Sequence, residues 1–356
     1  MMRRRCFLSA LGASAALPQV SWAAAGNPEY LAAARHGTDR YMLHGLRADG
    51  SSAFIIDLPG RGHAAAAHPH RAEAVAIARR PGTFAFVIDC VSGAVISRLT
   101  APEGRHFYGH GAFTADGATL LLTENDIASG AGRLSLWDVA AGYRRVAELP
   151  SGGIGPHEIL RRPDGGFAIA NGGIRTHPDT GREKLNLDTM APNLTLLDAD
   201  FRLERRVELP HALHQNSIRH LAARPDGQIA LGLQWNGGNE AVPSVAVVLP
   251  DGELQLCEVP DALARRIEGY VGSIAYSGDG TLIAATAPRG NCLMLFDPAT
   301  GDLAQVEPGI DICGVAATAT GLIATQGDGT IRWLPGASRD TLQADLAWDN
   351  HLVAIR

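Results

Sequence analysis

The sequence predicts an all-β fold, a seven-bladed β-propeller with four-stranded antiparallel blades. Three observations lead to this prediction: two alternating turn signatures, a repeat of about 47 residues, within the ~40–50 of propeller blades, and terminal strands that can complete one shared blade. Of the 356 residues, 46% are apolar, 19% are charged and 41 are glycine. This composition is typical of many short strands joined by tight turns.

The first turn signature ends a strand with Asp and turns at a Gly four residues later. It occurs in three copies and one weaker copy, at Asp89–Gly93, Asp138–Gly142, Asp297–Gly301 and Asp198. The second signature is an Asp-Gly turn between two apolar strands, at 116–117, 164–165, 226–227 and 279–280. Gly suits both turns because it accepts positive φ. Their alternation predicts blades that begin near residues 62, 106, 153, 215, 269 and 309, with one short helix within 261–270.

The seventh blade is expected to combine both ends of the chain. Residues 348–356 would supply its inner strand, and strands at 30–35, 41–46 and 52–58 would supply the other three. This closure removes exposed sheet edges. Residues 26–356 are therefore expected to form a single domain.

Residues 1–25 have the pattern of a secretory signal: a basic start, an apolar stretch, and small residues at a cleavage site near Ala23–Ala25. The run Arg4–Leu8 matches the twin-arginine motif, and an ordinary secretory signal is the alternative. No later apolar run approaches the ~18–20 residues of a membrane span. We therefore expect a periplasmic protein, exported by the twin-arginine route, without a membrane span.

The charge balance argues against nucleic-acid binding. Removing the three leader arginines leaves 28 of the 31 basic residues against 37 acidic ones. A nucleic-acid partner would need a basic surface to neutralise its phosphates.

Five of the seven predicted inner strands carry a histidine near their start: His63, His110, His157, His220 and His351. Propeller topology places inner-strand starts on the face that carries the long loops, so we expect these rings at the channel mouth there. Neutral imidazoles bind transition metals, so the five are candidate ligands for iron or copper. The alternatives are structural hydrogen bonds of the kind found in WD-type propellers, and ligand-binding or acid–base roles.

The longest loop of the same face, residues 171–193, is a second candidate site. It contains Arg175, His177, Arg182 and Lys184, and Lys184 is the only lysine in the chain. Clustered cations of this kind predict an anionic cofactor or an acidic partner. A solvated loop without a binding role is the alternative.

The four cysteines that follow the leader are far apart in the sequence. No pair forms a CxxC motif, and the absence of CxxCH excludes a covalent haem. We expect buried free thiols for most of them: Cys90, Cys257, Cys292 and Cys313.

Long motifs of the chain resemble one known family. They include RGHAAAAHP, RHFYGHGAF, GIGPHEIL, NGGIRTHPDTGREKLNLDTM, SIRHLA and WDNH. Together they resemble the DUF1513 family over about residues 28–352, which implies an exported bacterial protein with a propeller-type fold. The family's patterns include six histidines that this chain keeps: His63, His110, His157, His177, His220 and His351.

The resemblance also implies a role in metal handling, by association. Family members are commonly encoded beside imelysin-type periplasmic proteins and di-haem oxidoreductases, in clusters linked with iron acquisition. We therefore expect a metal-binding accessory or delivery protein with such partners. The alternatives are a metal-dependent hydrolase or lyase of the propeller type, and a protein-interaction scaffold with structural histidines.

Overall fold

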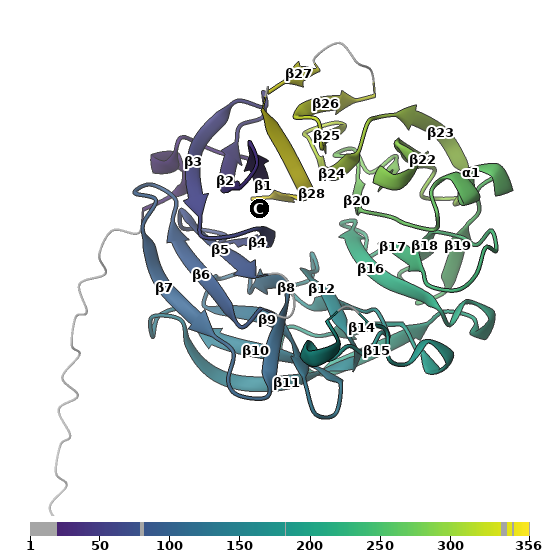
Figure 1. Ribbon diagram of the computed structural model, residues 1–356, viewed down its shortest axis with the longest axis horizontal. Helices are drawn as coiled ribbons and strands as arrows, with labels where there is room; N and C mark the ends of the chain where they lie inside the picture. Colours follow the sequence, from purple (N-terminus) through teal and green to yellow (C-terminus); the bar gives the residue numbers. More distant parts are fainter. Residues whose placement is uncertain (1–19, 79–81, 182, 336–339, 344, 356) are drawn as a thin grey trace, which may run out of the picture.

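The computed structural model describes residues 20–355 apart from 79–81, 182, 336–339 and 344, and it describes His63 by its backbone alone. Seven four-stranded antiparallel sheets surround a central axis (Figure 1). The predicted seven-bladed β-propeller is confirmed.

The blades are numbered here from the first whose four strands are consecutive in the chain. Blade 1 comprises β4 (Gly62–Ala67), β5 (Glu73–Ala78), β6 (Phe84–Asp89) and β7 (Val95–Thr100). Blade 2 comprises β8 (Arg105–Phe113), β9 (Thr119–Asp126), β10 (Ala131–Asp138) and β11 (Arg144–Ile154). Blade 3 comprises β12 (Pro156–Arg161), β13 (Phe167–Asn171), β14 (Asn193–Leu197) and β15 (Leu203–Glu208). Blade 4 comprises β16 (Asn216–Ala223), β17 (Ile229–Trp235), β18 (Val245–Val248) and β19 (Leu254–Cys257).

Blades 5 and 6 follow the same plan. Blade 5 comprises β20 (Ser273–Tyr276), β21 (Ile283–Ala287), β22 (Cys292–Phe296) and β23 (Leu303–Pro308). Blade 6 comprises β24 (Ile312–Ala317), β25 (Leu322–Gln326), β26 (Thr330–Leu334) and β27 (Thr341–Leu342). Short helices occupy connections: η1 (Trp22–Ala25), η2 (Pro178–Thr180), η3 (Leu187–Thr189), η4 (His211–Leu213), α1 (Asp261–Arg266) and η5 (Pro288–Gly290).

Blade 7 joins the two ends of the chain, as predicted. Its inner strand is β28 (Leu346–Ala354), which pairs with β1 (Tyr30–His36), followed by β2 (Arg40–Leu46) and β3 (Ser52–Leu58). The register sets Tyr30 opposite Ala354 and Ala34 opposite Trp348. Figure 1 shows β28 beside β1 at the centre of the ring.

The two turn signatures form the tight connections that the sequence predicts. The glycines of the Asp-Gly turns all have positive φ: Gly117, Gly165, Gly227 and Gly280. At each of these turns an Asp carboxylate accepts a backbone N–H two residues ahead. In the weaker copy at Asp198, the left-handed position is taken by Phe201 with φ of 64°.

Residues 20–25, which the sequence assigns to the leader, pack against the propeller. The Trp22 indole donates to the carbonyl of His68, and the carbonyl of Val20 accepts from Ala72 N–H, both across to blade 1. Ala25 is buried in the same apolar cluster as Leu31. A mature chain that began after Ala25 would lose these contacts. The twin-arginine motif lies outside the described residues.

Apolar clusters fill the spaces between neighbouring blades, so each sheet buries both faces. All four cysteines that follow the leader are buried free thiols, which confirms the expectation. Helix α1 falls within the predicted 261–270 segment. Among the helices of the described residues, none has the length and apolar character needed to cross a bilayer.

Candidate functional site

Four of the five predicted histidines meet on the propeller axis. Their ring centroids form a closed circuit, with 4.8 Å from His110 to His157, 5.2 Å from His157 to His220, 5.3 Å from His220 to His351, and 4.7 Å from His351 to His110. The diagonal from His110 to His220 is 6.5 Å. We call these four residues the channel cluster. The side chain of the fifth, His63, lies outside the described residues, although its backbone is in β4.

A break in strand register accompanies each of these histidines. In β8 the pairing shifts between Phe107 and Gly111, and Gly109 takes φ of 103° directly before His110. Similar shifts occur at His157 in β12, at His220 in β16, and between Trp348 and Leu352 around His351. A bulge inserts an extra residue and redirects nearby side chains. We attribute the turning of these rings toward the axis to the bulges.

The channel cluster lies deeper than the sequence predicted. We expected these rings at the channel mouth, and in the structure the four residues retain 9% or less of their surface. The reason is that β8, β16 and β28 begin four or five residues before their histidine, so the ring sits within the strand. The four rings converge, and three of them lie inside their strands and not at the strand start.

The partly buried carboxyl group of Glu158 lies beside the cluster. Glu158 Oε2 lies 3.3 Å from His220 Nδ1 and accepts the backbone N–H of Leu221 at 3.3 Å. Burial raises the pKa of Glu158 to about 7, although His351 and that N–H act in the opposite direction. Burial lowers the pKa of His220 to about 3, and Arg219 acts in the same direction. His220 is therefore a neutral imidazole at pH 7.

Two further groups near the cluster have structural partners. Asp349 receives Arg61 through two hydrogen bonds of 2.8 and 3.1 Å. Burial alone raises the pKa of Asp349, but the hydrogen bonds and charge of Arg61 hold it below its usual value. Cys313 lies at the bulge of β24, and its thiol donates to the carbonyls of Thr325 and Trp348. Burial raises the pKa of this thiol well above its usual value, so it stays protonated.

The ring spacing of the channel cluster is close to that of a four-histidine metal site. Four imidazoles bound to one ion through bonds of about 2.1 Å place neighbouring ring centroids roughly 4.5–5.2 Å apart. The sides of the circuit, 4.7 to 5.3 Å, are close to this range. Within the part of the chain that the structure describes, however, no three His, Cys, Asp or Glu residues are placed to hold an ion.

The cluster forms one end of a cavity of about 820 Å³. His110, His220, His351 and Glu158 line this end, and the inner strands form the wall. The other end reaches exposed Asp-Gly turns at Pro163, Asp226 and Asp279. Among the described residues, the lining therefore reaches the face with short turns. The sequence instead predicts a functional site on the face with long loops.

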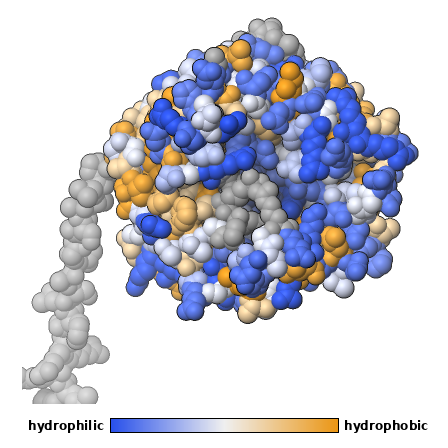
Figure 2. Space-filling model, viewed as in Figure 1, coloured by the Kyte–Doolittle hydropathy of each residue, from blue (hydrophilic) through white to orange (hydrophobic). Residues whose placement is uncertain are grey.

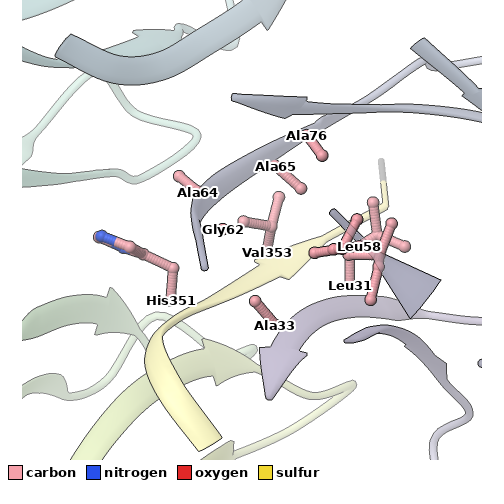
Figure 3. A pocket seen from close by; sticks show the side chains of 10 residues that line it. Leu31, Ala33, Leu58, Gly62, Ala64, Ala65, Ala76, His351 and Val353 are labelled. Atoms are coloured by element: carbon pink, nitrogen blue, oxygen red, sulfur yellow. The ribbon is translucent and has the colours of Figure 1, made fainter. Parts of the chain in front are cut away.

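A much smaller cavity lies between blades 7 and 1. It measures about 10 Å³, close to the lower limit for one water molecule, and its lining is almost entirely apolar. Figure 3 shows that the His351 ring points away from Leu31 and Leu58 of this lining. The small cavity is therefore a packing gap beside the channel cluster and does not offer a binding site.

The candidate residues of the 171–193 loop do not line either cavity, as far as they are described. Arg175 is exposed, and its guanidinium donates to the carbonyl of Ala128 at 3.2 Å. The His177 ring accepts the N–H of Asp179 and caps η2. Lys184 is exposed, and Arg182 lies outside the described residues. Hydrophilic side chains dominate the face of the molecule shown in Figure 2.

Sequence reasoning missed the cavity and its wall. Alanines occupy the channel-lining parts of several inner strands: Ala64–Ala67, Ala112, Ala222–Ala223, Ala275 and Ala316–Ala317. The run GHAAAAH after residue 61 is visible in the sequence. Small residues in inner strands leave space along the axis, so this run was the available signal.

Fold and site together define the class: a seven-bladed β-propeller with a buried histidine cluster at the end of a channel cavity. The family follows from the sequence. The chain belongs to the DUF1513 family, whose model, described as a protein of unknown function, matches residues 56–355. A comparison with curated proteins finds no match.

Solved structures share the fold at low sequence identity. Hydrazine synthase of Kuenenia stuttgartiensis matches with a TM-score of 0.62 and 13% identity, over 84% of this chain and 90% of that chain. A chain of the mitotic checkpoint complex matches with a TM-score of 0.54 and 12% identity, over 99% of this chain and 86% of that chain. At these identities the comparison shows the propeller fold alone.

Proposed function

We propose that this protein is a periplasmic propeller that binds a transition-metal ion, iron or copper, in the channel cluster. In this proposal it acts as an accessory or delivery factor in metal acquisition. The observation that carries the proposal is the convergence of four imidazoles from four different blades on one axis.

The chemistry of the donors supports metal binding. Imidazole binds metal in its neutral form, and His220 is held neutral by burial. The carboxyl group of Glu158 beside its Nδ1 favours a proton on that atom and leaves the Nε2 lone pair available. Metal-binding histidines commonly have such a carboxylate partner, which fixes the ring orientation.

The leader and the family associations support the cellular context of the proposal. A twin-arginine leader suits a protein that folds, and can acquire a cofactor, before export. Imelysin-type proteins and di-haem oxidoreductases are the partners that the family resemblance implies. Iron is therefore the first metal to test, and copper is the second.

Metal titration of the purified protein tests the proposal. Protein stripped with a chelator would be titrated with Fe(II) under anaerobic conditions and with Cu(II), with metal content measured by mass spectrometry. We expect one ion per chain. The double variant His110→Ala/His157→Ala should weaken binding by more than about 100-fold, since outer partners of metal ligands alone contribute about 10–100-fold.

The chain offers a matched control for this variant. His211 and His214 form a stacked pair at the surface, with ring centroids 5.4 Å apart. His211→Ala/His214→Ala removes the same number of imidazoles away from the channel and should leave the channel ion in place. Equal metal affinity in the channel variant and the wild type would contradict the proposal.

A metal-dependent hydrolase or lyase is the second candidate, and one observation favours it. The cluster lies at the end of a cavity large enough for an organic substrate, with Glu158 exposing 20% of its side-chain surface there. A group with a pKa of about 7 suits proton transfer. Turnover of ester or lactone substrates that disappears in Glu158→Gln would support this candidate over a carrier.

A further inference from the structure

The channel cavity has apolar stretches in its wall that a bare metal ion would not need. Beyond the channel cluster these stretches are formed by the alanines named above, together with Phe113, Leu160, Ile274, Tyr276 and Val315, and they alternate with polar residues. Its volume of about 820 Å³ lies within the ~300–1,000 Å³ of small-molecule sites. A hydrated ion would fill only a part of it, because each water occupies about 30 Å³.

The charged residues of the wall differ in how far they are neutralised. Arg162 pairs with Asp164 at 2.7 Å and with Glu204 at 2.5 Å, and Arg224 pairs with Asp226 at 2.6 Å. Arg161, the last residue of β12, is half-buried and lines the same cavity. Among the described residues it has no carboxylate within ion-pair distance. Arg161 therefore carries an unpaired positive charge beside apolar parts of the wall. The carboxylates without an arginine partner among the described residues lie elsewhere in the lining: Asp279 is held by Ser277 and Thr281 at its own turn, and Glu158 is next to His220 in the channel cluster.

We infer that the channel cavity binds a small organic anion with an apolar body, which enters from the face of the Asp-Gly turns. Arg161 recognises the carboxylate or sulfonate head through charge-assisted hydrogen bonds. The alanine and aromatic side chains hold the apolar body by burying its surface. The site goes beyond the proposed metal function and needs no ion, so either one can fail without the other.

Two fluorescent probes of nearly identical shape test the inference. Anilinonaphthalene sulfonate carries an apolar body and an anionic head, and N-phenylnaphthylamine is the same body without the sulfonate. Both would be titrated into full-length mature protein in the presence of a chelator, so that bound metal plays no part. We expect both probes to bind and the sulfonate to bind more tightly.

Variants of the wall separate the two parts of the site. Arg161→Gln should weaken binding of the sulfonate about tenfold, the value of one charge-assisted contact, and leave the neutral probe unchanged. Arg144→Gln, on an exposed position of outer strand β11, is the matched control and should change neither affinity. Ala223→Phe and Ala317→Phe narrow the cavity from blades 4 and 6 and should weaken both probes.

Two results would contradict the inference, one for the anion contact and one for the cavity. If Arg161→Gln leaves the sulfonate affinity unchanged, the anion site is wrong. If both phenylalanine variants remain folded by circular dichroism and bind both probes as the wild type does, the cavity is not the site. Because the arginine substitution is compared through the ratio of two probe affinities, it stays informative even if the phenylalanine variants unfold.

Discussion

Two groups of histidines are buried in this propeller, and they differ in what their rings contact. His44 and His68 have partners within their own blade: His44 Nδ1 lies 3.2 Å from the hydroxyl of Ser52, and His68 Nδ1 accepts the N–H groups of His70 and Arg71 at 3.0 Å. The four rings of the channel cluster instead contact one another across blades. The hydrogen bonds of the first group stabilise local turns and strands. The second group brings four imidazole rings together at one point.

The comparison shows that burial does not identify a functional histidine. Burial lowers the pKa of both His44 and His68 to about 4, and that of His220 to about 3. All three are therefore neutral at pH 7, whichever group they belong to. What distinguishes the channel cluster is convergence from separate strands, because a fold selected for stability alone gains little from crowding four imidazoles together.

The largest expected effect is on the free energy of unfolding. It is expected for His68, one of the two histidines with partners in their own blade. His68→Leu should lower the free energy of unfolding by about 1–3 kcal/mol, because it removes the acceptor of two partly buried N–H groups. His157→Leu should lower it by less than His68→Leu does, because leucine can replace the packing of this ring against its neighbours His110 and His220. Urea unfolding followed by circular dichroism measures both, and the reverse order would break the comparison.

The second effect concerns metal affinity and falls on the channel cluster. Glu158→Gln should weaken binding of the proposed ion by about 10–100-fold, because the carboxyl group beside His220 Nδ1 fixes that ring. Glu253→Gln, at an exposed position, is the control and should leave affinity unchanged. Full affinity in Glu158→Gln, measured by calorimetric titration, would mean that this carboxyl group does not position the ring.

The fold could be predicted because its turns restrict the residues that can form them. Asp and Gly recur at blade corners where only certain residues satisfy the backbone, as Gly117 and Gly227 show. The convergence of the histidines followed from the same repeat. Their depth did not, because register shifts such as that between Phe107 and Gly111 depend on pairing with a second strand. Periodicity along one strand cannot reveal an inserted residue.

The position of the cavity could not be predicted for a related reason. Residues such as Ala223 and Ala317 give no positive signal in a sequence, because alanine is equally common in a tightly packed core. In the sequence, Arg161 looks like the other arginines that precede Asp-Gly turns. Only the structure shows that its neighbour Arg162 forms ion pairs, whereas Arg161 forms none among the described residues. The charged residues of the 171–193 loop predicted a binding site on the long-loop face, whereas the channel cavity reaches the opposite face.

Acid should destabilise the fold through the local histidines. His44 and His68 have folded pKa values of about 4, below the unfolded value of 6.5. As pH falls below 6.5, the unfolded chain takes up protons that the folded chain does not accept until about pH 4. Stability is therefore lost across this window, by at most about 1.4 kcal/mol per pH unit for each histidine.

The variant His44→Phe tests how much protonation of His44 alone contributes to this pH dependence. Phenylalanine can keep the edge contact that His44 makes with Trp348 at 5.0 Å, but it does not titrate. The slope of unfolding free energy against pH should become shallower between pH 6.5 and 4, by up to one proton. An unchanged slope in this window would show that His44 does not titrate with folding.

The smallest effect is expected on the long-loop face, where the sequence placed a cofactor site. Arg175→Gln should change stability by less than about 0.5 kcal/mol, because Arg175 is exposed and its guanidinium makes one hydrogen bond to Ala128. Affinity for the proposed ion should also stay within about twofold, since Arg175 does not line the cavity. A larger loss of affinity with unchanged stability would mean that the loop face takes part in binding. The channel would then need to be accessible from both faces.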